Sequence, residues 1–254
     1  MIEDLKGKRI LVTGSSTGIG AAVAKAYAAN GAVVAVHYNA SKEPAEALVA
    51  EIAHARGKAI LVGGDVSKSR EAIRIVDEAA AGLGGLDVLV NNAGALVKRA
   101  PLDELDDEIY DRVLDLNVRS VVFASQAAAR HMRKAGKGSI INTSSVAARN
   151  GGGPGALLYA SAKAFVLNAT RNLAKELAGA HIRVNGVSPG VIATPFHERY
   201  STPEILEGMR KTIPMGVIGT PEDCTGAYLF FASDTLSGYI TGQVLEVNGG
   251  QFMA

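Results

Sequence analysis

The segment YASAK places a tyrosine, Tyr159, and a lysine, Lys163, four residues apart among small side chains. In a helix, residues at this spacing share one face, so the phenol and the ammonium would lie side by side. A phenol with its ordinary pKa of ~10 exchanges protons poorly at neutral pH, and a nearby ammonium favours the phenolate and lowers that pKa. Such a pair would suit proton transfer. The alternative is a partly buried ring beside a solvated surface lysine.

A glycine-rich turn lies near the start of the chain, in ILVTGSSTGIGAAVAKAY. Gly14, Gly18 and Gly20 fall between a strand-like run and a helix-like run. Glycines there allow positive φ and let a diphosphate approach the N–H groups at a helix N-terminus. The spacing is GxxxGxG rather than the common dinucleotide-binding GxGxxG, and a plain tight turn could use the same residues. Its position after the first strand of a βαβ series favours phosphate binding.

The elements that must position these residues alternate along the whole chain. Apolar, β-branched runs predict strands over 9–13, 32–38, 58–65, 86–92, 138–145, 182–189 and 243–248. Most of these runs lack polar alternation, which is typical of strands covered on both faces. Ala-rich stretches of helical periodicity lie between them. We therefore expect one α/β domain over residues 1–254, with a doubly wound parallel sheet, helices on both faces and right-handed crossovers.

Residues 191–220 interrupt this pattern with several prolines, although the segment still looks partly helical. In parallel sheets of this kind, ligands bind beyond the carboxyl ends of the strands. We interpret the segment as a lid over the substrate, with a purely structural cap as the alternative.

Composition restricts the possible partners. The chain has 26 Lys and Arg against 25 Asp and Glu, a net charge of +1, which offers no electrostatic footprint for nucleic acid or an anionic membrane. Cys224 is the only cysteine, and the five histidines form no metal-ligand spacing, so no disulfide or metal site is expected. No apolar run approaches the ~20 residues of a membrane span. The acidic start does not resemble a signal peptide. We expect a cytoplasmic protein.

Four motifs follow one another in the order TGSSTGIG (13–20), NNAG (91–94), YASAK (159–163) and SPGVIAT (188–194). In their order and spacing the chain resembles the classical short-chain dehydrogenase/reductase family over nearly its whole length. The resemblance implies a single Rossmann-type domain, a nicotinamide cofactor, hydride transfer between that cofactor and a carbonyl or secondary alcohol, and a homotetramer. The C-terminal TGQVLEVNGG looks like an edge strand, whose open hydrogen bonds are often paired in an oligomer.

The resemblance implies four catalytic residues. Tyr159 would exchange a proton with the substrate oxygen, while Lys163 and the positive charge of the oxidised nicotinamide would lower its pKa. Lys163 would also bind the ribose hydroxyls. Ser145 would orient the substrate oxygen, with Ser144 as a competing candidate; Tyr159 follows Ser145 by 14 residues, one more than is common in the family. Asn117, in a helix where asparagine is a poor former, would complete a proton relay through water, or else cap a local kink.

The resemblance also implies the residues that bind the cofactor. Asn91, Ala93 and Gly94 would leave room for the adenosine ribose, and the SPGVIAT segment would turn beneath the nicotinamide. Asp65 would accept a hydrogen bond from the adenine amine, unless it is a helix N-cap. The full set is Gly14, Ser16, Thr17, Gly18, Ile19, Gly20, Tyr38, Asn39, Asp65, Val66, Asn91, Ala93, Gly94, Tyr159, Lys163, Pro189, Gly190, Ile192 and Thr194.

The end of the second strand bears on the choice of nicotinamide. Enzymes of this fold that prefer NAD carry an acid there, which binds both ribose hydroxyls. Here Tyr38 holds that place, and no carboxylate follows until Glu43. Asn39, Ser41 and Lys42 can donate hydrogen bonds to a 2′-phosphate. Thr17, in contrast, stands where many NADP-using relatives carry Arg or Lys. We expect NADP rather than NAD.

Less can be predicted about the substrate. Relatives that act on acyl-carrier thioesters often have basic residues at positions that here are Gly136 and Ala180, although Lys134, Lys137 and His181 lie close by. Residues 197–200, HERY, carry polar groups that suit a hydroxylated substrate. We expect the substrate to be a small polar secondary alcohol or sugar. The alternative is that the chain is a 3-oxoacyl-[acyl-carrier-protein] reductase. A non-catalytic nucleotide-binding scaffold is disfavoured because both Tyr159 and Lys163 are present.

Overall fold

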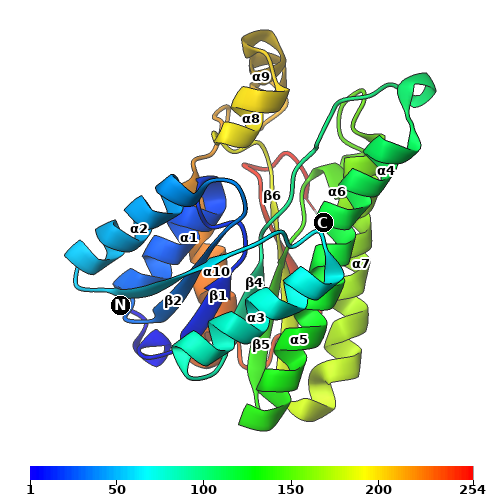
Figure 1. Ribbon diagram of the computed structural model, residues 1–254. Helices are drawn as coiled ribbons and strands as arrows, with labels where there is room; N and C mark the ends of the chain where they lie inside the picture. The colour runs from blue at the N-terminus through cyan, green and yellow to red at the C-terminus, as the bar shows by residue number, and fades with distance from the viewer. Residues whose placement is uncertain (254) are drawn as a thin grey trace.

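Seven strands form a single parallel sheet in a computed structural model that describes residues 1–253 (Figure 1). Their order is β3-β2-β1-β4-β5-β6-β7: strands β2 and β3 are added on one side of β1, and strands β4 to β7 on the other. This arrangement confirms the predicted doubly wound α/β fold. The strands are β1 (Arg9–Val12), β2 (Val33–Tyr38), β3 (Lys58–Gly63), β4 (Val88–Asn91), β5 (Gly138–Thr143), β6 (Ile182–Pro189) and β7 (Val244–Val247).

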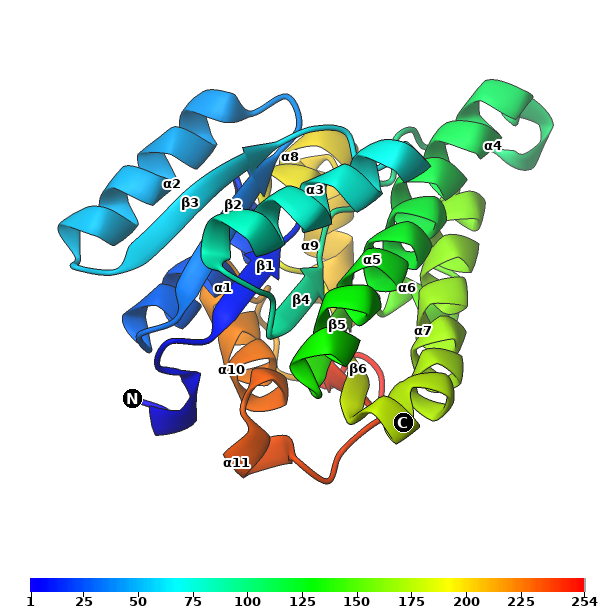
Figure 2. The same ribbon diagram turned by 60° about the horizontal axis from the view of Figure 1, so that its bottom comes forward.

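Helices cover both faces of the sheet, as Figures 1 and 2 show. Residues of β1 divide between two apolar cores: Ile10 and Val12 belong to one, and Leu11 to the other. Successive side chains of a strand point to opposite faces, which explains why the strands are apolar without alternation. One core includes α1 (Gly18–Ala29), α2 (Lys42–His54) and α10 (Pro221–Ala232); the other includes α3 (Ser69–Leu83), α5 (Ser120–Ala135) and α7 (Leu157–Leu177).

The remaining elements are short. A π-helical segment (Asp115–Arg119) joins α4 (Asp107–Leu114) directly to α5. Three 3₁₀ turns, Glu3–Leu5, Leu102–Glu104 and Ala178–Ala180, and the helices α6 (Ala147–Asn150) and α11 (Asp234–Ser237) complete the chain outside residues 191–220. Within residues 1–253, no helix has both the length and the apolar character that crossing a membrane requires.

Residues 191–220, the lid segment, rise beyond the carboxyl ends of the strands as α8 (Pro195–Tyr200) and α9 (Pro203–Arg210) (Figure 1). Each helix begins with a proline, at a position whose N–H has no intrahelical partner in any case. A parallel bridge between Ile192 and Gly219 joins the two ends of the segment. The segment is thus an ordered projection at the ligand-binding edge of the sheet, and its action as a lid stays a prediction.

Candidate active site

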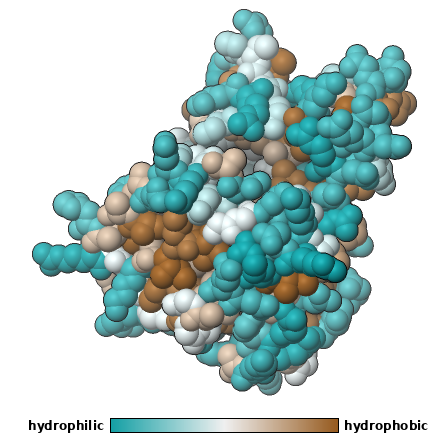
Figure 3. All heavy atoms as spheres, viewed as in Figure 1, coloured by the Kyte–Doolittle hydropathy of each residue, from teal (hydrophilic) through white to brown (hydrophobic). Residues whose placement is uncertain are grey.

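A cleft of about 770 Å³ opens at the carboxyl ends of the strands. Figure 3 shows a hollow between the lobe formed by α8 and α9 and the lobe formed by α4, with mostly hydrophilic residues on its rim. The four motifs contribute to this one cleft. The predicted residues that line it are Gly14, Ser16, Thr17, Gly18, Ile19, Gly20, Asn39, Val66, Ala93, Gly94, Ser145, Tyr159, Lys163, Pro189, Gly190, Ile192 and Thr194.

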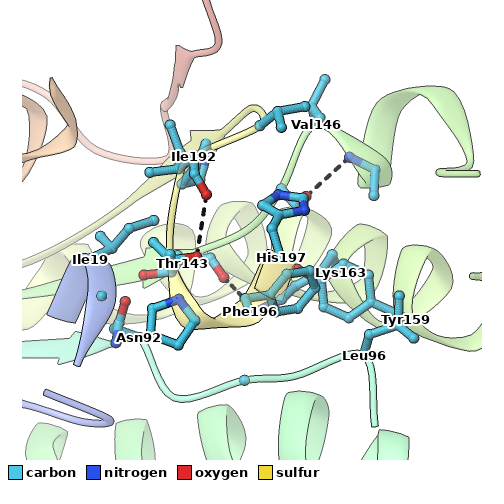
Figure 4. Close-up of a pocket in the computed structure, with 18 of the residues that line it drawn as sticks. Ile19, Asn92, Leu96, Thr143, Val146, Tyr159, Lys163, Ile192, Phe196 and His197 are labelled. Atoms are coloured by element: carbon cyan, nitrogen blue, oxygen red, sulfur yellow. Dashed lines mark hydrogen bonds between the residues drawn. The ribbon is translucent and has the colours of Figure 1, made fainter. Parts of the chain in front are cut away.

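Tyr159 and Lys163 lie side by side on α7 (Figure 4). The Lys163 Nζ is 5.8 Å from the centroid of the Tyr159 ring. Lys163 is only 3% exposed, and its Nζ donates a hydrogen bond to the Thr143 carbonyl at 2.9 Å. The Tyr159 ring packs against Phe196 of the lid segment, with 5.7 Å between ring centroids. The alternative of a solvated surface lysine is therefore wrong.

Burial governs the proton affinities of this pair. It raises the pKa of the Tyr159 phenol to about 12, although a hydrogen bond with Ser145 acts in the opposite direction. It lowers the pKa of the Lys163 ammonium to about 8. Burial outweighs the hydrogen bond with Ser145, and a lowering of the phenol pKa by Lys163 stays a prediction for the site with its cofactor bound. These groups keep Tyr159 protonated at neutral pH, the form that can donate a proton.

The two neighbouring serines have different surroundings. Ser144 is buried, and its hydroxyl donates to the Lys163 carbonyl at 2.9 Å, which ties the end of β5 to α7. Ser145 lines the cleft beside Tyr159, and its Oγ accepts a hydrogen bond from the Ala147 N–H at 3.1 Å. Both serines line the cleft, but the Ser144 hydroxyl already binds a backbone carbonyl, so Ser145 remains the serine that we expect to meet a substrate. The extra residue before Tyr159 falls where α6 gives way to a turn whose glycines adopt positive φ.

Asn117 lies in the π-helical segment, a local distortion of the helix between α4 and α5. Its Nδ2 donates to the backbone carbonyls of Ala95 and Val113, at 2.8 and 2.9 Å. Its Oδ1 is buried and has no hydrogen-bond partner among the described residues. A Cβ built on Gly94 would lie 2.7 Å from this Oδ1 and 2.9 Å from the Lys163 Nζ. Both polar atoms therefore face the same space above Gly94, where the predicted proton relay would run.

Two side chains that sequence reasoning missed form hydrogen bonds with the backbone of the glycine-rich turn. The Asn92 Nδ2 donates to the carbonyls of Thr13 and Gly14, at 2.9 and 3.0 Å. The His37 Nδ1 accepts from the Gly14 N–H at 2.9 Å. Gly14 has a φ of +62°, and a Cβ there would lie 2.9 Å from the Ala93 Cα. Asn92 could have been found, because it is the second asparagine of the NNAG motif; His37 carried no comparable signal.

Two predicted cofactor contacts, Tyr38 and Asp65, are not among the residues that line the cleft. The Tyr38 ring lies across Gly63 of the neighbouring strand, since a Cβ on that glycine would be 2.6 Å from the Tyr38 Cζ. The Asp65 carboxylate accepts from the N–H and the hydroxyl of Ser67, at 3.0 and 2.7 Å, and so stabilises the turn before α3. Their chain neighbours Asn39 and Val66 line the cleft instead.

Asn91 is also buried below the cleft rather than lining it. Its Nδ2 donates to the Asn142 Oδ1 at 2.8 Å and to the Ser125 hydroxyl at 3.0 Å. The residue therefore ties β4 to β5 and α5 and supports the cleft from below, and its predicted contact with the cofactor stays a prediction.

Comparison with known proteins agrees with this geometry. A profile of the family described as Enoyl-(Acyl carrier protein) reductase matches residues 14–251. A 3-oxoacyl-[acyl-carrier-protein] reductase of Synechocystis sp. is 40% identical over 243 residues, which cover 96% of each chain. The chain belongs to the classical short-chain dehydrogenase/reductase family. This short-chain dehydrogenase/reductase is an oxidoreductase that uses a nicotinamide cofactor and acts on alcohol and carbonyl groups.

Solved structures of the family superpose on the whole chain. The NADH-dependent reductase A1-R′, responsible for alginate metabolism, is 41% identical with a TM-score of 0.91, and the match covers 99% of this chain and 100% of that one. A short chain dehydrogenase from Burkholderia cenocepacia in complex with NADP is 38% identical with a TM-score of 0.91, over 98% of this chain and 99% of that one. The same architecture therefore serves both NADH and NADP.

Proposed function

We propose that this short-chain dehydrogenase/reductase interconverts a small polar secondary alcohol or sugar and its carbonyl form, with NADP favoured over NAD. The lining of the cleft around Tyr159 carries this proposal. Arg99, Asn150 and His197 bring polar groups to it, and residues 152–154 in the turn before α7 bring backbone with little apolar bulk. Such a wall can hydrogen-bond several hydroxyls of one substrate. The similarity to a reductase responsible for alginate metabolism supports the same substrate class.

The residues of the cleft fit a dinucleotide and divide the chemistry among them. The orphaned Asn117 Oδ1 and the Lys163 Nζ flank a space that only glycine leaves open at position 94. The nicotinamide supplies or accepts the hydride when it is bound. Tyr159, held protonated by burial, donates its proton to the developing alkoxide, and Ser145 orients that oxygen. Lys163 binds the ribose and favours the phenolate that Tyr159 leaves behind.

The preference for NADP rests on the mouth of the cleft after β2. Asn39, Ala40 and Ser41 line it, and among the described lining residues none is Asp or Glu. A 2′-phosphate would thus meet neutral donors and no carboxylate. Lys42 forms an ion pair with Glu46 at 3.2 Å, so Asn39 and Ser41 are the donors we assign. A hydrogen bond to a charged group contributes about 1.5–3 kcal/mol, which is roughly a ten- to hundredfold preference.

The alternative is a 3-oxoacyl-[acyl-carrier-protein] reductase, favoured by the 40% identity to the enzyme of Synechocystis. The surface offers little to an acidic carrier at the two positions noted above. Gly136 ends α5 in the left-handed region with a φ of +81°, and Ala180 lies in a 3₁₀ turn. The adjacent Lys137 contacts Asp234 at 3.2 Å. The polar substrate therefore remains the first choice.

Nicotinamide absorbance with purified protein tests the proposal directly. One substrate set is aldoses, alditols and their acids with NADP or NAD; the other is an acetoacetyl thioester with NADPH or NADH. We expect turnover of the polar set, at least roughly tenfold faster in kcat/KM with NADP. Fast thioester reduction without polar turnover would establish the alternative, and comparable use of both cofactors would refute the NADP preference.

A Tyr159→Phe variant separates an enzyme from a nucleotide-binding scaffold. Loss of the proton donor should lower kcat by roughly 10²–10⁴-fold while NADP affinity stays within about threefold. Unchanged turnover would refute the role of the phenol.

We also infer a cytoplasmic homotetramer, as the family resemblance implies. The edge strand β7 leaves Leu245 43% exposed, and the nearby Tyr239 is fully exposed. Such apolar groups beside an open edge suit burial in an oligomer. Light scattering should give four times the chain mass of 26.3 kDa.

A further inference from the structure

The charged groups of the cleft are few and of one sign. Among the described residues that line it, none is Asp or Glu, and the only Lys and Arg are Lys163 and Arg99. Lys163 is buried beside Tyr159 and bonded to the Thr143 carbonyl. Arg99 is therefore the one lining cation, within the described part of the chain, that the proton chemistry does not use.

Arg99 is half-buried, and its bonds leave its charge unneutralised. Its Nε donates to the Tyr200 carbonyl at 2.9 Å, and its Nη1 donates to the Pro154 carbonyl at 3.0 Å. Both acceptors are neutral, and Arg99 forms no ion pair within residues 1–253. A guanidinium has five N–H donors, so these two bonds orient it and leave donors for another group. A partly desolvated cation of this kind favours an anionic partner.

The backbone holds Arg99 firmly. Val97, two residues before it, has a φ of +67°, which is rare for a β-branched residue. The Lys98 N–H donates to the Leu96 carbonyl at 2.9 Å and closes a three-residue turn around Val97. On the other side, the Ala100 N–H donates to the Gly155 carbonyl at 3.1 Å. The guanidinium is thus aimed by a strained turn and a second anchor, as a recognition group requires.

A chain of aromatic contacts connects Arg99 to the reacting centre. The Phe196 ring lies 5.7 Å from the Tyr159 ring and 5.0 Å from the Tyr200 ring, and the Tyr200 carbonyl binds Arg99. Figure 4 shows Phe196, His197 and Tyr159 in the same cleft. The His197 pKa is lowered by burial and by the Arg99 charge, so its ring is neutral at pH 7 and suits a hydroxyl.

We propose that Arg99 binds a carboxylate on the substrate, remote from the carbon that reacts beside Tyr159, so that the substrate is a short hydroxylated acid such as a sugar acid. This inference rests on the proposed function and names its substrate class. One unpaired guanidinium beside a neutral histidine matches one negative charge. A phosphate monoester, with nearly two charges and three acceptor oxygens, would leave more of its acceptors without donors.

The experiment compares substrates that differ only in charge, using the protein saturated with cofactor. An aldonate and the alditol of the same carbon skeleton are tested by kcat/KM, and hexose 6-phosphates are added as a third class. Thermal shifts in the presence of NADP report binding independently of turnover. The variants are Arg99→Gln, Arg99→Lys and, as a control, Arg112→Gln, which removes an exposed arginine on α4 that does not line the cleft.

We expect the wild type to favour the aldonate at least tenfold. Arg99→Gln should lower kcat/KM for the aldonate roughly 30–300-fold, mainly through KM, and change that for the alditol less than threefold. Arg99→Lys should recover part of the loss, and Arg112→Gln should behave as the wild type does.

Three outcomes would overturn the inference. Equal losses for aldonate and alditol would mean that Arg99 only fastens the lid segment. A preference for hexose phosphates would assign the charge to phosphate. Absence of any Arg99-dependent thermal shift with the acids would exclude a carboxylate site, even if turnover of neutral alcohols upheld the proposed function.

Discussion

His37 is the residue through which acid should destabilise this protein. It is 1% exposed, its Nδ1 accepts from the Gly14 N–H at 2.9 Å, and its Nε2 donates to the Gly64 carbonyl at 3.0 Å. A protonated ring would have two N–H groups, and one would then face the Gly14 N–H. Burial accordingly lowers the pKa of His37 to about 4, with a further lowering from Arg74 and an opposing contribution from Asp65.

The magnitude follows from the difference between the folded and unfolded proton affinities. An unfolded histidine has a pKa near 6.5, so between pH 6.5 and about 4 the unfolded chain binds a proton that the native state excludes. Stability is therefore fully present above pH 6.5 and falls as the pH decreases through this window. Integrating the two titrations gives a loss of about 2 kcal/mol between pH 7 and pH 5, from this one residue.

Urea unfolding of the wild type, His37→Gln and His54→Gln at pH 7.0, 6.0 and 5.0 provides the assay. Glutamine cannot titrate in this range, so His37→Gln should be less stable at pH 7 but should lose about 2 kcal/mol less than the wild type on acidification. His54 is exposed on α2, and His54→Gln controls for the exchange of a histidine for a glutamine as such. Parallel pH curves for the wild type and His37→Gln would refute the reasoning.

Three further outcomes are expected. Gly94→Ala would place a Cβ 2.7 Å from the Asn117 Oδ1 and 2.9 Å from the Lys163 Nζ. Stopped-flow or steady-state assays should therefore show kcat reduced at least roughly tenfold. Urea unfolding should show a loss of about 1–3 kcal/mol in the free energy of unfolding. Asn39→Asp would set a carboxylate against a 2′-phosphate, and the NADPH-to-NADH ratio of kcat/KM should fall roughly tenfold or more. Cys224 is buried with its pKa raised to about 12, so a thiol reagent should label it at pH 8 only after unfolding.

Each of these outcomes has a result that contradicts its premise. Wild-type turnover in Gly94→Ala would mean that the space above residue 94 has no role in catalysis. An unchanged cofactor ratio in Asn39→Asp would remove Asn39 from the cofactor site. Rapid labelling of the native thiol would show that α10 opens without global unfolding.

The fold could be predicted almost completely, because most strands are apolar on both faces and helical stretches alternate with them along the chain. The seven predicted strands correspond to β1–β7 with small differences at their ends. The π-helical segment around Asn117 could not be read from local propensity, which suggests only a weak helix former. The raised pKa of Tyr159 was equally inaccessible, because desolvation depends on how Phe196 and the lid segment cover the phenol.

The pairing of β4 with β5 explains why the NNAG motif located the cleft but did not show which of its asparagines would line it. Asn91 and Asn92 are adjacent, yet the side chains of successive strand residues point to opposite faces. In β4, Asn91 is paired with Asn142 of β5, so its amide faces inward and joins a buried network that continues to Thr170. A buried amide is stabilising only where such partners exist. Asn92 follows the last residue of β4, and its amide instead holds the glycine-rich turn. The motif locates the site, but the pairing of β4 with β5 decides which asparagine supports the sheet and which one faces the cleft.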